Sequence, residues 1–233
     1  MDECIILAGG FGTRLQLVVK DVPKCMAEVA GKPFLYYLFN YLKQQKISHI
    51  ILSLGYKSEV VTDWLSENSF PFNVSYIVEK EPLGTGGAIK LAMSKAQSQS
   101  VFVINGDTYF NVDLPLMKAL HTKRNADISI ALKPMQNFDR YGSVELDAES
   151  RIVHFNEKKQ CEAGLINGGV YLINNSVFAN NGLNDKFSFE KDILENKSFN
   201  LNISGHTENG YFIDIGIPSD FEKANIDFIK FGK

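Results

Sequence analysis

Short apolar runs alternate with helical patterns through the first half of the chain, and this alternation limits the folds open to it. Four apolar runs predict strands, at residues 4–8, 49–54, 74–78 and 101–105. Three segments with apolar residues at helical spacing lie between them, over 33–45, from 58 onward and over 87–96. Strands that alternate with helices pair in parallel and carry helices on both faces of the sheet. The predicted fold class is therefore α/β with a mainly parallel sheet.

Two of these helices carry start signals. Pro33 suits a first helical position, because its fixed φ is already helical and its missing N–H costs nothing there. Ser58 is a residue type that caps helices through its hydroxyl. We expect one helix to begin at each of these residues.

The pattern changes at about residue 127, because from there predicted strands follow one another in the sequence. These strands are expected at residues 128–132, 142–146, 152–155 and 165–173. Closing helices are expected near 190–195 and 219–231. No repeat, low-complexity tract or linker divides the chain, so we expect one continuous domain over residues 1–233 with a strand-rich C-terminal extension of the sheet.

Composition excludes several classes of protein. The 24 Lys and Arg residues are scattered against 27 Asp and Glu residues, so no concentrated basic surface for nucleic acid is expected. No apolar stretch is long enough for a membrane helix, and the first residues lack the features of a secretory signal, so we expect a cytoplasmic protein without a membrane partner. The three cysteines are widely spaced and predict neither a disulfide framework nor a zinc cluster.

Ligands of open α/β sheets bind at the carboxyl ends of the strands, which directs attention to loops 9–24, 79–87 and 106–111. The first loop lies within Leu7-Ala-Gly-Gly-Phe-Gly-Thr-Arg-Leu15. Its glycines allow consecutive N–H groups to cradle phosphate oxygens, and Arg14 and Lys24 add positive charge. A plain glycine-rich turn stays an alternative. Neither the dinucleotide fingerprint nor the Walker A loop fits, because Leu15 and Pro33 stand where those motifs need Gly and Ser or Thr.

Six ordered motifs resemble the signature of the sugar-1-phosphate nucleotidylyltransferases. They are the first loop with Pro23-Lys24 and Gly31-Lys32-Pro33, then Glu81-Pro-Leu-Gly-Thr-Gly-Gly87, Asn105-Gly-Asp107, Glu157-Lys158, Asn167-Gly-Gly-Val-Tyr171 and Asp214-Ile-Gly-Ile-Pro218. The resemblance covers nearly the whole chain. It implies a Rossmann-like nucleotide-diphospho-sugar transferase fold, with a nucleotide-binding half over about 1–126 and a sugar-phosphate-binding half over about 127–233.

Two carboxylates are candidates for a metal site. Asp107 comes at the end of the central apolar strand, and Asp214 ends another short apolar run far along the chain. Two carboxylates, completed by phosphate oxygens and waters, suit Mg²⁺, although an Asp after a strand can also simply form a turn. In the family, the residues that match Asp107 and Asp214 hold this metal ion.

The resemblance also implies roles for the other motif residues. The expected catalytic residues are Arg14, Lys24 and Asp107. Nucleotide binding is expected from Leu7, Ala8, Gly9, Gly10, Gly12, Thr13, Arg14, Glu81, Gly84, Thr85 and Gly106. Sugar-phosphate binding is expected from Glu157, Lys158, Asn167 and Gly168, with a strand bulge as the alternative for the Gly168-Gly169 pair. The partners are a nucleoside triphosphate and a sugar 1-phosphate, and homo-oligomerisation is left open.

The implied reaction needs no covalent intermediate. A sugar 1-phosphate oxygen attacks the α-phosphorus in line and pyrophosphate leaves, so positioning and charge neutralisation carry the rate. Arg14 and Mg²⁺ would act on the triphosphate, Lys24 at the α-phosphate and Lys158 on the phosphate of the sugar. The four histidines are dispersed, and we interpret them as structural or surface residues.

Base and sugar are predicted from two further segments. An acidic residue just before the second glycine-rich loop, Glu81, can accept two hydrogen bonds from guanine, which favours GTP. The run Val18-Val-Lys-Asp-Val-Pro-Lys24 resembles the D-glycero-α-D-manno-heptose 1-phosphate guanylyltransferases, which make GDP-heptose for bacterial surface polysaccharide.

Several alternatives stay open at this point. One is another sugar phosphate, with UTP, CTP or dTTP as the donor. Another is phosphocholine, held by rings such as Tyr141, Tyr171 and Tyr211. The last is a non-catalytic subunit that senses nucleotide sugars.

Overall fold

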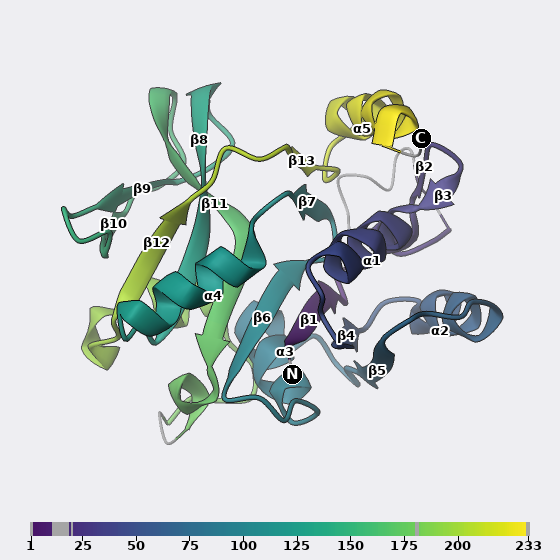
Figure 1. The fold of residues 1–233 in the computed structure, drawn as a ribbon, viewed down its shortest axis with the longest axis horizontal. Helices are drawn as coiled ribbons and strands as arrows, with labels where there is room; N and C mark the ends of the chain where they lie inside the picture. The colour runs from purple at the N-terminus through teal and green to yellow at the C-terminus, as the bar shows by residue number, and fades with distance from the viewer. Residues whose placement is uncertain (1, 11–18, 20, 180–181, 232–233) are drawn as a thin grey trace.

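The computed structural model describes residues 2–10, 19, 21–179 and 182–231. Within these residues, nine strands form one sheet (Figure 1). Its parallel part consists of β5 (Asn73–Val78), β4 (His49–Leu54), β1 (Glu3–Ala8) and β6 (Ser100–Asn105), side by side in that order. The four strands predicted in the first half of the chain are therefore confirmed.

Antiparallel pairing extends the sheet beyond β6, mainly through one long strand. This strand, β11 (Cys161–Asn174), pairs with β6 and with β8 (Ile128–Phe138). Three other strands complete the extension: β9 (Ser143–Leu146) and β10 (Ile152–Phe155), which pair antiparallel, and β12 (Ile203–Thr207), which pairs in parallel with β8. The strand-rich extension is as predicted, although β8 and β11 are longer than expected because they pair with each other over most of their length.

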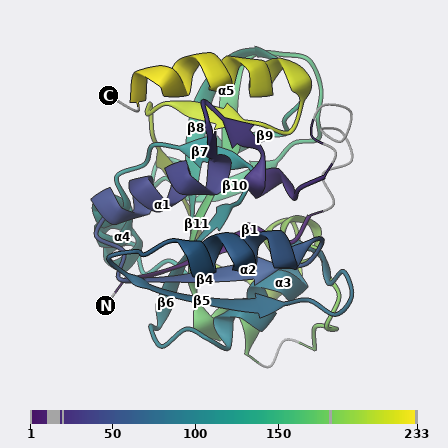
Figure 2. The same cartoon turned by 90° about the vertical axis from the view of Figure 1, so that its right-hand side faces the viewer.

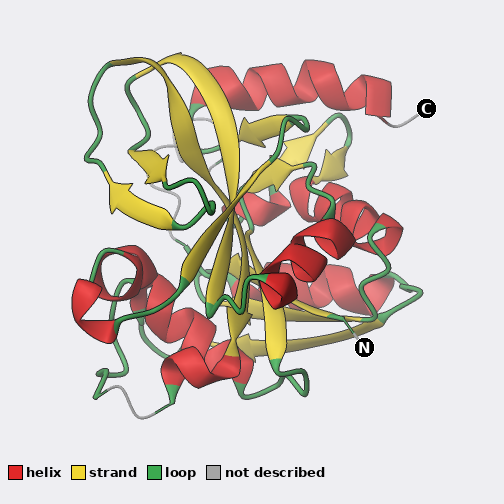
Figure 3. Ribbon diagram, turned by 60° about the vertical axis from the view of Figure 1, so that its left-hand side comes forward, coloured by secondary structure: helices red, strands yellow, loops and turns green. Residues whose placement is uncertain are grey.

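Helices cover both faces of the sheet (Figure 3). Side chains of β1 alternate between the two cores: Cys4 and Ile6 face one, and Ile5 faces the other. The first core contains residues of α1 (Phe34–Gln44), α2 (Ser58–Glu67), α4 (Leu114–Lys123) and α5 (Pro218–Phe231). The second core contains Ile89 and Ala92 of α3 (Gly84–Met93). The predicted α/β class with helices on both faces is thus confirmed.

Two short strand pairings and four short helical turns complete the architecture of the described residues. In Figure 2, α5 lies at one end of the molecule, far from α2 and α3. Near α5 lie β2 (Glu28–Val29) and β3 (Lys32–Pro33), which pair with each other, and β13 (Phe212–Asp214), which pairs with β7 (Thr108–Phe110). Short helical turns are η1 (Lys24–Met26), η2 (Asn175–Phe178), η3 (Glu190–Leu194) and η4 (Lys197–Phe199).

The predicted helix starts are only partly confirmed. The helix α2 begins at Ser58 as expected, but Ser58 does not cap it, because Lys57 takes the N-cap position in a left-handed conformation (φ 51°) and no side chain caps the helix. Pro33 precedes α1 as its N-cap with extended ψ. The helix expected from residue 87 begins at Gly84 and ends at Met93, and the helix expected at 190–195 is a single π-helical turn, η3.

The helix α4 was not predicted, although its start signals are present in the sequence. Asp113 caps it by accepting a hydrogen bond from the N–H of Leu116 at 2.9 Å, and Pro115 follows at the start of the helix. The apolar pattern is weak because the helix buries few residues, among them Leu114 and Met117. No helix of the described residues is both long and apolar enough to cross a membrane.

Glu3, at the start of β1, is a buried carboxylate that should contribute to stability. It contacts His49 at 2.8 Å and accepts hydrogen bonds from the N–H groups of Gln97 (2.8 Å) and Ser98 (2.5 Å). Burial alone would raise the pKa of this carboxyl, but the hydrogen bonds outweigh burial and lower the pKa to about 2. Because the folded-state pKa lies below the ordinary value, the ionised carboxylate stabilises the fold above about pH 4.5, and this contribution is lost as the pH falls towards 2.

We expect Glu3→Gln to lower the free energy of unfolding by about 3 kcal/mol at pH 7, with a smaller loss at pH 3, as measured by urea denaturation. The exposed Glu67 on α2 provides the control, because Glu67→Gln should leave stability unchanged at both pH values. An equal loss for Glu3→Gln at pH 3 and pH 7 would contradict the assignment.

Candidate active site

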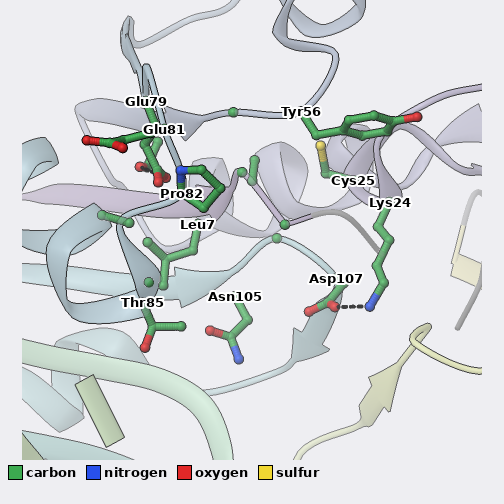
Figure 4. Close-up of a pocket in the computed structure, with 18 of the residues that line it drawn as sticks. Leu7, Lys24, Cys25, Tyr56, Glu79, Glu81, Pro82, Thr85, Asn105 and Asp107 are labelled. Atoms are coloured by element: carbon green, nitrogen blue, oxygen red, sulfur yellow. Dashed lines mark hydrogen bonds and ion pairs between the residues drawn. The ribbon is translucent and has the colours of Figure 1, made fainter. Parts of the chain in front are cut away.

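A pocket of about 550 Å³ lies at the carboxyl ends of the parallel strands (Figure 4). Its wall combines residues from the ends of β1, β4, β5 and β6 with residues of the second glycine-rich loop. Some residues of each of the three loops singled out from the sequence lie on its wall. The predicted residues on its wall are Leu7, Ala8, Gly9, Gly10, Lys24, Glu81, Gly84, Thr85, Gly106 and Asp107.

Close backbone packing brings the strand ends together beneath the pocket. The N–H of Gly106 donates to the carbonyl of Leu7 at 2.9 Å, and a Cβ on Gly106 would lie 2.6 Å from that oxygen. The N–H of Glu79 donates to the carbonyl of Leu54, which joins the ends of β5 and β4. Gly106 is therefore required for the approach of β6 to β1, and this approach places Asp107 at the pocket.

The second glycine-rich loop is covered by a segment from the other half of the chain. The N–H of Gly86 donates to the carbonyl of Phe187 at 3.1 Å, and the N–H of Phe187 donates to the carbonyl of Leu83 at 3.0 Å. A Cβ on Gly86 would lie 2.1 Å from the ring of Phe187. The absence of a side chain at Gly86 thus serves this packing, whereas Gly84 and Thr85 remain on the pocket wall.

Two glutamates at the start of this loop differ in their environment. The carboxylate of Glu79 accepts hydrogen bonds from the N–H of Leu83 (3.0 Å) and the hydroxyl of Ser53 (3.4 Å), so it holds the turn of the loop. Glu81 is exposed at the tip of that turn and makes no hydrogen bond or ion pair with any other residue that the structure describes. Figure 4 shows both carboxylates at the same end of the pocket, away from Lys24.

Lys24 and Asp107 form an ion pair at the opposite end of the pocket. Lys24 Nζ lies 2.9 Å from Asp107 Oδ2, with both side chains partly exposed (Figure 4). Lys24 is positioned by η1, and Asp107 by the turn between β6 and β7.

The short β7–β13 pairing brings Asp214 to the same place. Asp214 is the register partner of Thr108, and the N–H of Ile215 donates to the carbonyl of Asp107 at 3.0 Å. Burial raises the pKa of Asp214, and the negative charge of Asp107 raises it further, whereas Lys24 and Arg140 oppose this. Two carboxylates that the sequence separates by more than a hundred residues are therefore electrostatic neighbours.

Arg140 and Tyr141, in the turn between β8 and β9, lie beside Asp214. Arg140 Nη2 donates to Asp220 Oδ2 at 2.6 Å, and its guanidinium lies 5.4 Å from the centre of the Tyr141 ring. Burial raises the pKa of the Tyr141 hydroxyl, and the Asp214 carboxylate raises it further. No motif pointed to Arg140, whereas Tyr141 was named only as a ring for a different ligand.

Candidate nucleophiles on the described wall are poorly suited to covalent catalysis. Cys25 lines the pocket, but burial, with the charge of Asp107, raises the pKa of its thiol to about 12. The hydroxyl of Ser53 donates to Glu79. No histidine lies on this wall, since His49 contacts Glu3 and Ser75 and the other three lie elsewhere, in agreement with the structural roles expected of them.

The four predicted sugar-phosphate residues lie off the wall of this pocket. Glu157 and Lys158 are exposed on the loop between β10 and β11. Asn167 donates to the hydroxyl of Tyr171 at 2.9 Å and accepts from the N–H of Gly169 at 3.0 Å, inside a register shift of β11. Gly168 is buried against Phe110, so the strand-bulge interpretation of the glycine pair describes its geometry.

Three predicted residues of the first loop, Gly12, Thr13 and Arg14, lie outside the described residues. The structure also adds wall residues that the motifs did not assign: Ser53, Gly55, Tyr56, Glu79, Asn105 and Glu190. The residues at the ends of β4, β5 and β6 could have been predicted from the rule that ligands bind at the carboxyl ends of strands. No comparable sequence signal pointed to Glu190.

Comparison with known proteins agrees with this geometry. The model of the nucleotidyl transferase family matches residues 3–230. The chain is 47% identical over 222 residues to D-glycero-alpha-D-manno-heptose 1-phosphate guanylyltransferase of Aneurinibacillus thermoaerophilus, covering 95% of this chain and 96% of the relative. It is 43% identical over 219 residues to the enzyme of the same name from Campylobacter jejuni, covering 94% and 96%.

Comparison with solved structures supports the same family. The chain resembles HddC from Yersinia pseudotuberculosis with a TM-score of 0.88 and 40% identity, covering 98% of this chain and 100% of that chain. A second structure of HddC, complexed with GMP-PN, gives a TM-score of 0.87. The family resemblance drawn from the motifs is therefore confirmed: the chain belongs to the nucleotidyl transferase family.

Proposed function

We propose that the protein transfers a guanylyl group from GTP to D-glycero-α-D-manno-heptose 1-phosphate, giving GDP-heptose and pyrophosphate. The observation that carries this proposal is the position of Asp214 beside the ion pair of Lys24 and Asp107, which lies on the wall of a pocket large enough for a nucleotide. We assign the phosphates to this end of the pocket. The guanylyltransferase relatives, which match this chain nearly end to end, support the choice of base and sugar.

The reaction brings together two anions, and the proposed roles of the residues follow from that requirement. An oxygen of the sugar phosphate attacks the α-phosphorus, the bond to the β-phosphate oxygen breaks, and pyrophosphate leaves with the electron pair. Lys24 stabilises the charge that develops on the α-phosphate. Lys158 and Arg14 retain their expected roles on the sugar phosphate and the triphosphate. The poorly suited nucleophiles of the pocket wall favour this direct displacement.

A divalent metal ion fits the pair Asp107 and Asp214. Burial raises the pKa of Asp214, and the negative charge of Asp107 raises it further, whereas Lys24 only partly opposes this. Among the described residues no cluster of three or more potential ligand side chains occurs, so phosphate oxygens and waters would complete the coordination shell. Mg²⁺ bound there would neutralise charge on the triphosphate.

Base selection is assigned to Glu81. Glu79 already accepts two hydrogen bonds within the protein, whereas Glu81 stands at the tip of the turn that Glu79 holds. A carboxylate can accept hydrogen bonds from N1–H and the exocyclic amine of guanine together, an arrangement that uracil, cytosine and thymine do not offer.

The test is a matrix of five triphosphates (GTP, CTP, UTP, dTTP and ATP) against a panel of sugar 1-phosphates, with pyrophosphate release as the readout. We expect the highest kcat/KM for GTP with the heptose 1-phosphate. Glu81→Gln should lower kcat/KM for GTP by about tenfold to a hundredfold, because the glutamine amide places a donor against guanine donors.

The exposed Glu59 on α2 supplies the matched control, since Glu59→Gln should leave every column of the matrix unchanged. Preference of the parent enzyme for UTP or CTP would refute the assignment of guanine. If Glu81→Gln keeps full activity with GTP and the same order of preference among the five triphosphates, Glu81 does not select the base.

A further inference from the structure

Glu190 is a carboxylate on the pocket wall that the proposed reaction does not use. It opens η3, a single π-helical turn, and such turns occur frequently at functional sites. Its side chain is half-buried. A negative charge here is unsuited to holding phosphate, so this part of the pocket faces a different portion of the ligand.

Two hydroxyl groups orient this carboxylate through one of its oxygens. Thr85 Oγ1 donates to Glu190 Oε2 at 2.6 Å, and Ser188 Oγ donates to the same atom at 3.1 Å. The Thr85 hydroxyl is itself fixed, because it accepts a hydrogen bond from the N–H of Phe189 at 2.9 Å. Glu190 is therefore held against the second glycine-rich loop, and Figure 4 shows Thr85 at that part of the pocket.

The other oxygen, Oε1, accepts no hydrogen bond and forms no ion pair within the part of the chain that the structure describes. An ionised carboxylate offers only acceptors, so a ligand group that meets Oε1 must donate. Neither organic substrate of the proposed reaction carries a cationic group, and the metal ion is assigned to Asp107 and Asp214. The donors that remain on such ligands are the hydroxyl groups of their sugar rings and the N–H groups of the base, which is assigned to Glu81.

We infer that Glu190 is a specificity-determining residue that accepts a hydrogen bond from a sugar-ring hydroxyl of a substrate. Carboxylates recognise ribose hydroxyls in this way in dinucleotide-binding proteins. Two substrates carry this chemistry: the ribose of the triphosphate and the ring of the sugar 1-phosphate. The inference rests on the proposed function, because both ligands come from it.

A purely structural role predicts a different outcome. If Glu190 only fastens residues 185–190 to the glycine-rich loop, its loss should disturb both substrates and lower thermal stability. Asp192 provides the matched control, since it lies in the same turn and accepts a hydrogen bond from the N–H of Ser188 at 2.7 Å, but is not on the pocket wall.

The experiment compares the parent, Glu190→Gln and Asp192→Asn by steady-state kinetics and thermal melting. We expect Glu190→Gln to raise KM about tenfold or more for one substrate, with kcat within threefold and the melting temperature close to that of the parent. Asp192→Asn should leave both KM values within twofold.

Analogues that lack one hydroxyl identify the source. With the parent enzyme, one analogue should show the same rise in KM that Glu190→Gln shows with the intact substrate. This analogue is 2′-deoxy-GTP, 3′-deoxy-GTP or one deoxy derivative of the sugar 1-phosphate. With Glu190→Gln, the KM for that analogue should be no higher than the KM for the intact substrate. Additive losses, or unchanged KM values for both substrates, would overturn the inference, as would equal losses in Glu190→Gln and Asp192→Asn.

Two further measurements keep the inference testable. If Glu190→Gln folds poorly, Thr85→Val removes one orienting hydroxyl and should raise KM for the same substrate to a smaller extent. If the parent turns over none of the triphosphates, the proposed function fails on its own. Calorimetric binding of GTP, the sugar 1-phosphate and their deoxy analogues to the parent and Glu190→Gln then decides whether Glu190 binds a ring hydroxyl of either ligand, and equal affinities of parent and variant for every ligand would overturn the inference.

Discussion

Asp107→Asn should reduce kcat by about a thousandfold or more, measured as pyrophosphate release at saturating GTP and sugar 1-phosphate. The substitution preserves the size of the side chain but removes its negative charge. That charge forms an ion pair with Lys24 at 2.9 Å and lies next to the carboxylate of Asp214. Loss of the charge both weakens the proposed metal site and leaves Lys24 without its ion-pair partner. Removing preorganised electrostatic interactions of this kind commonly costs two to three orders of magnitude in rate.

The fold should survive this change. Asp107 is partly exposed, and its backbone carbonyl, which accepts from Ile215, is unaffected by the substitution. We therefore expect a melting temperature close to that of the parent, and weaker Mn²⁺ binding to the enzyme in the presence of a non-hydrolysable triphosphate, followed by electron paramagnetic resonance.

Asp63→Asn on the exposed face of α2 is the control for this experiment and should change neither rate nor metal binding. Turnover of Asp107→Asn within tenfold of the parent would remove Asp107 from the catalytic machinery, whatever its effect on stability.

Local sequence patterns were sufficient for the parallel half of the fold. The runs at β1, β4 and β6 are apolar because these strands are buried on both faces, and this gives a signal that needs no knowledge of neighbours. The edge strand β5 is more exposed. The positions of Gly9, Gly106 and Asp107 on the pocket wall follow from the same signal, since each residue comes directly after such a run.

Contacts between distant segments could not be read in the same way. Asp214 meets Asp107 through two strands of three residues each, which are too short to carry a periodic pattern. Glu190 reaches the pocket only because Phe187 packs on Gly86, a contact that spans about a hundred residues. The segment thus acquires its place from tertiary packing alone.

The C-terminal half of the chain shows a further limit of motif reading. Asn167 and Gly168 were assigned to ligand binding because they match a motif, but their side-chain and backbone contacts also explain them as parts of a bulge in β11. A motif reports that a residue type is required at a position, and both packing and binding can impose that requirement.

Lys24→Gln should lower kcat by about a hundredfold to a thousandfold, with a smaller change in KM for GTP, in single-turnover and steady-state assays. The ammonium group lies beside Asp107 at the end of the pocket to which we assign the phosphates. In the proposed reaction, charge on the α-phosphate increases as pyrophosphate leaves, so stabilisation by Lys24 would be greatest in the transition state. Lys90 on α3 is a matched control, because it also pairs with an aspartate, Asp185 at 3.5 Å, but lies off the pocket wall, and Lys90→Gln should leave kcat unchanged. A loss confined to KM would assign Lys24 to ground-state binding of the triphosphate. In that case the charge that develops at the α-phosphate would have to be stabilised by groups other than Lys24.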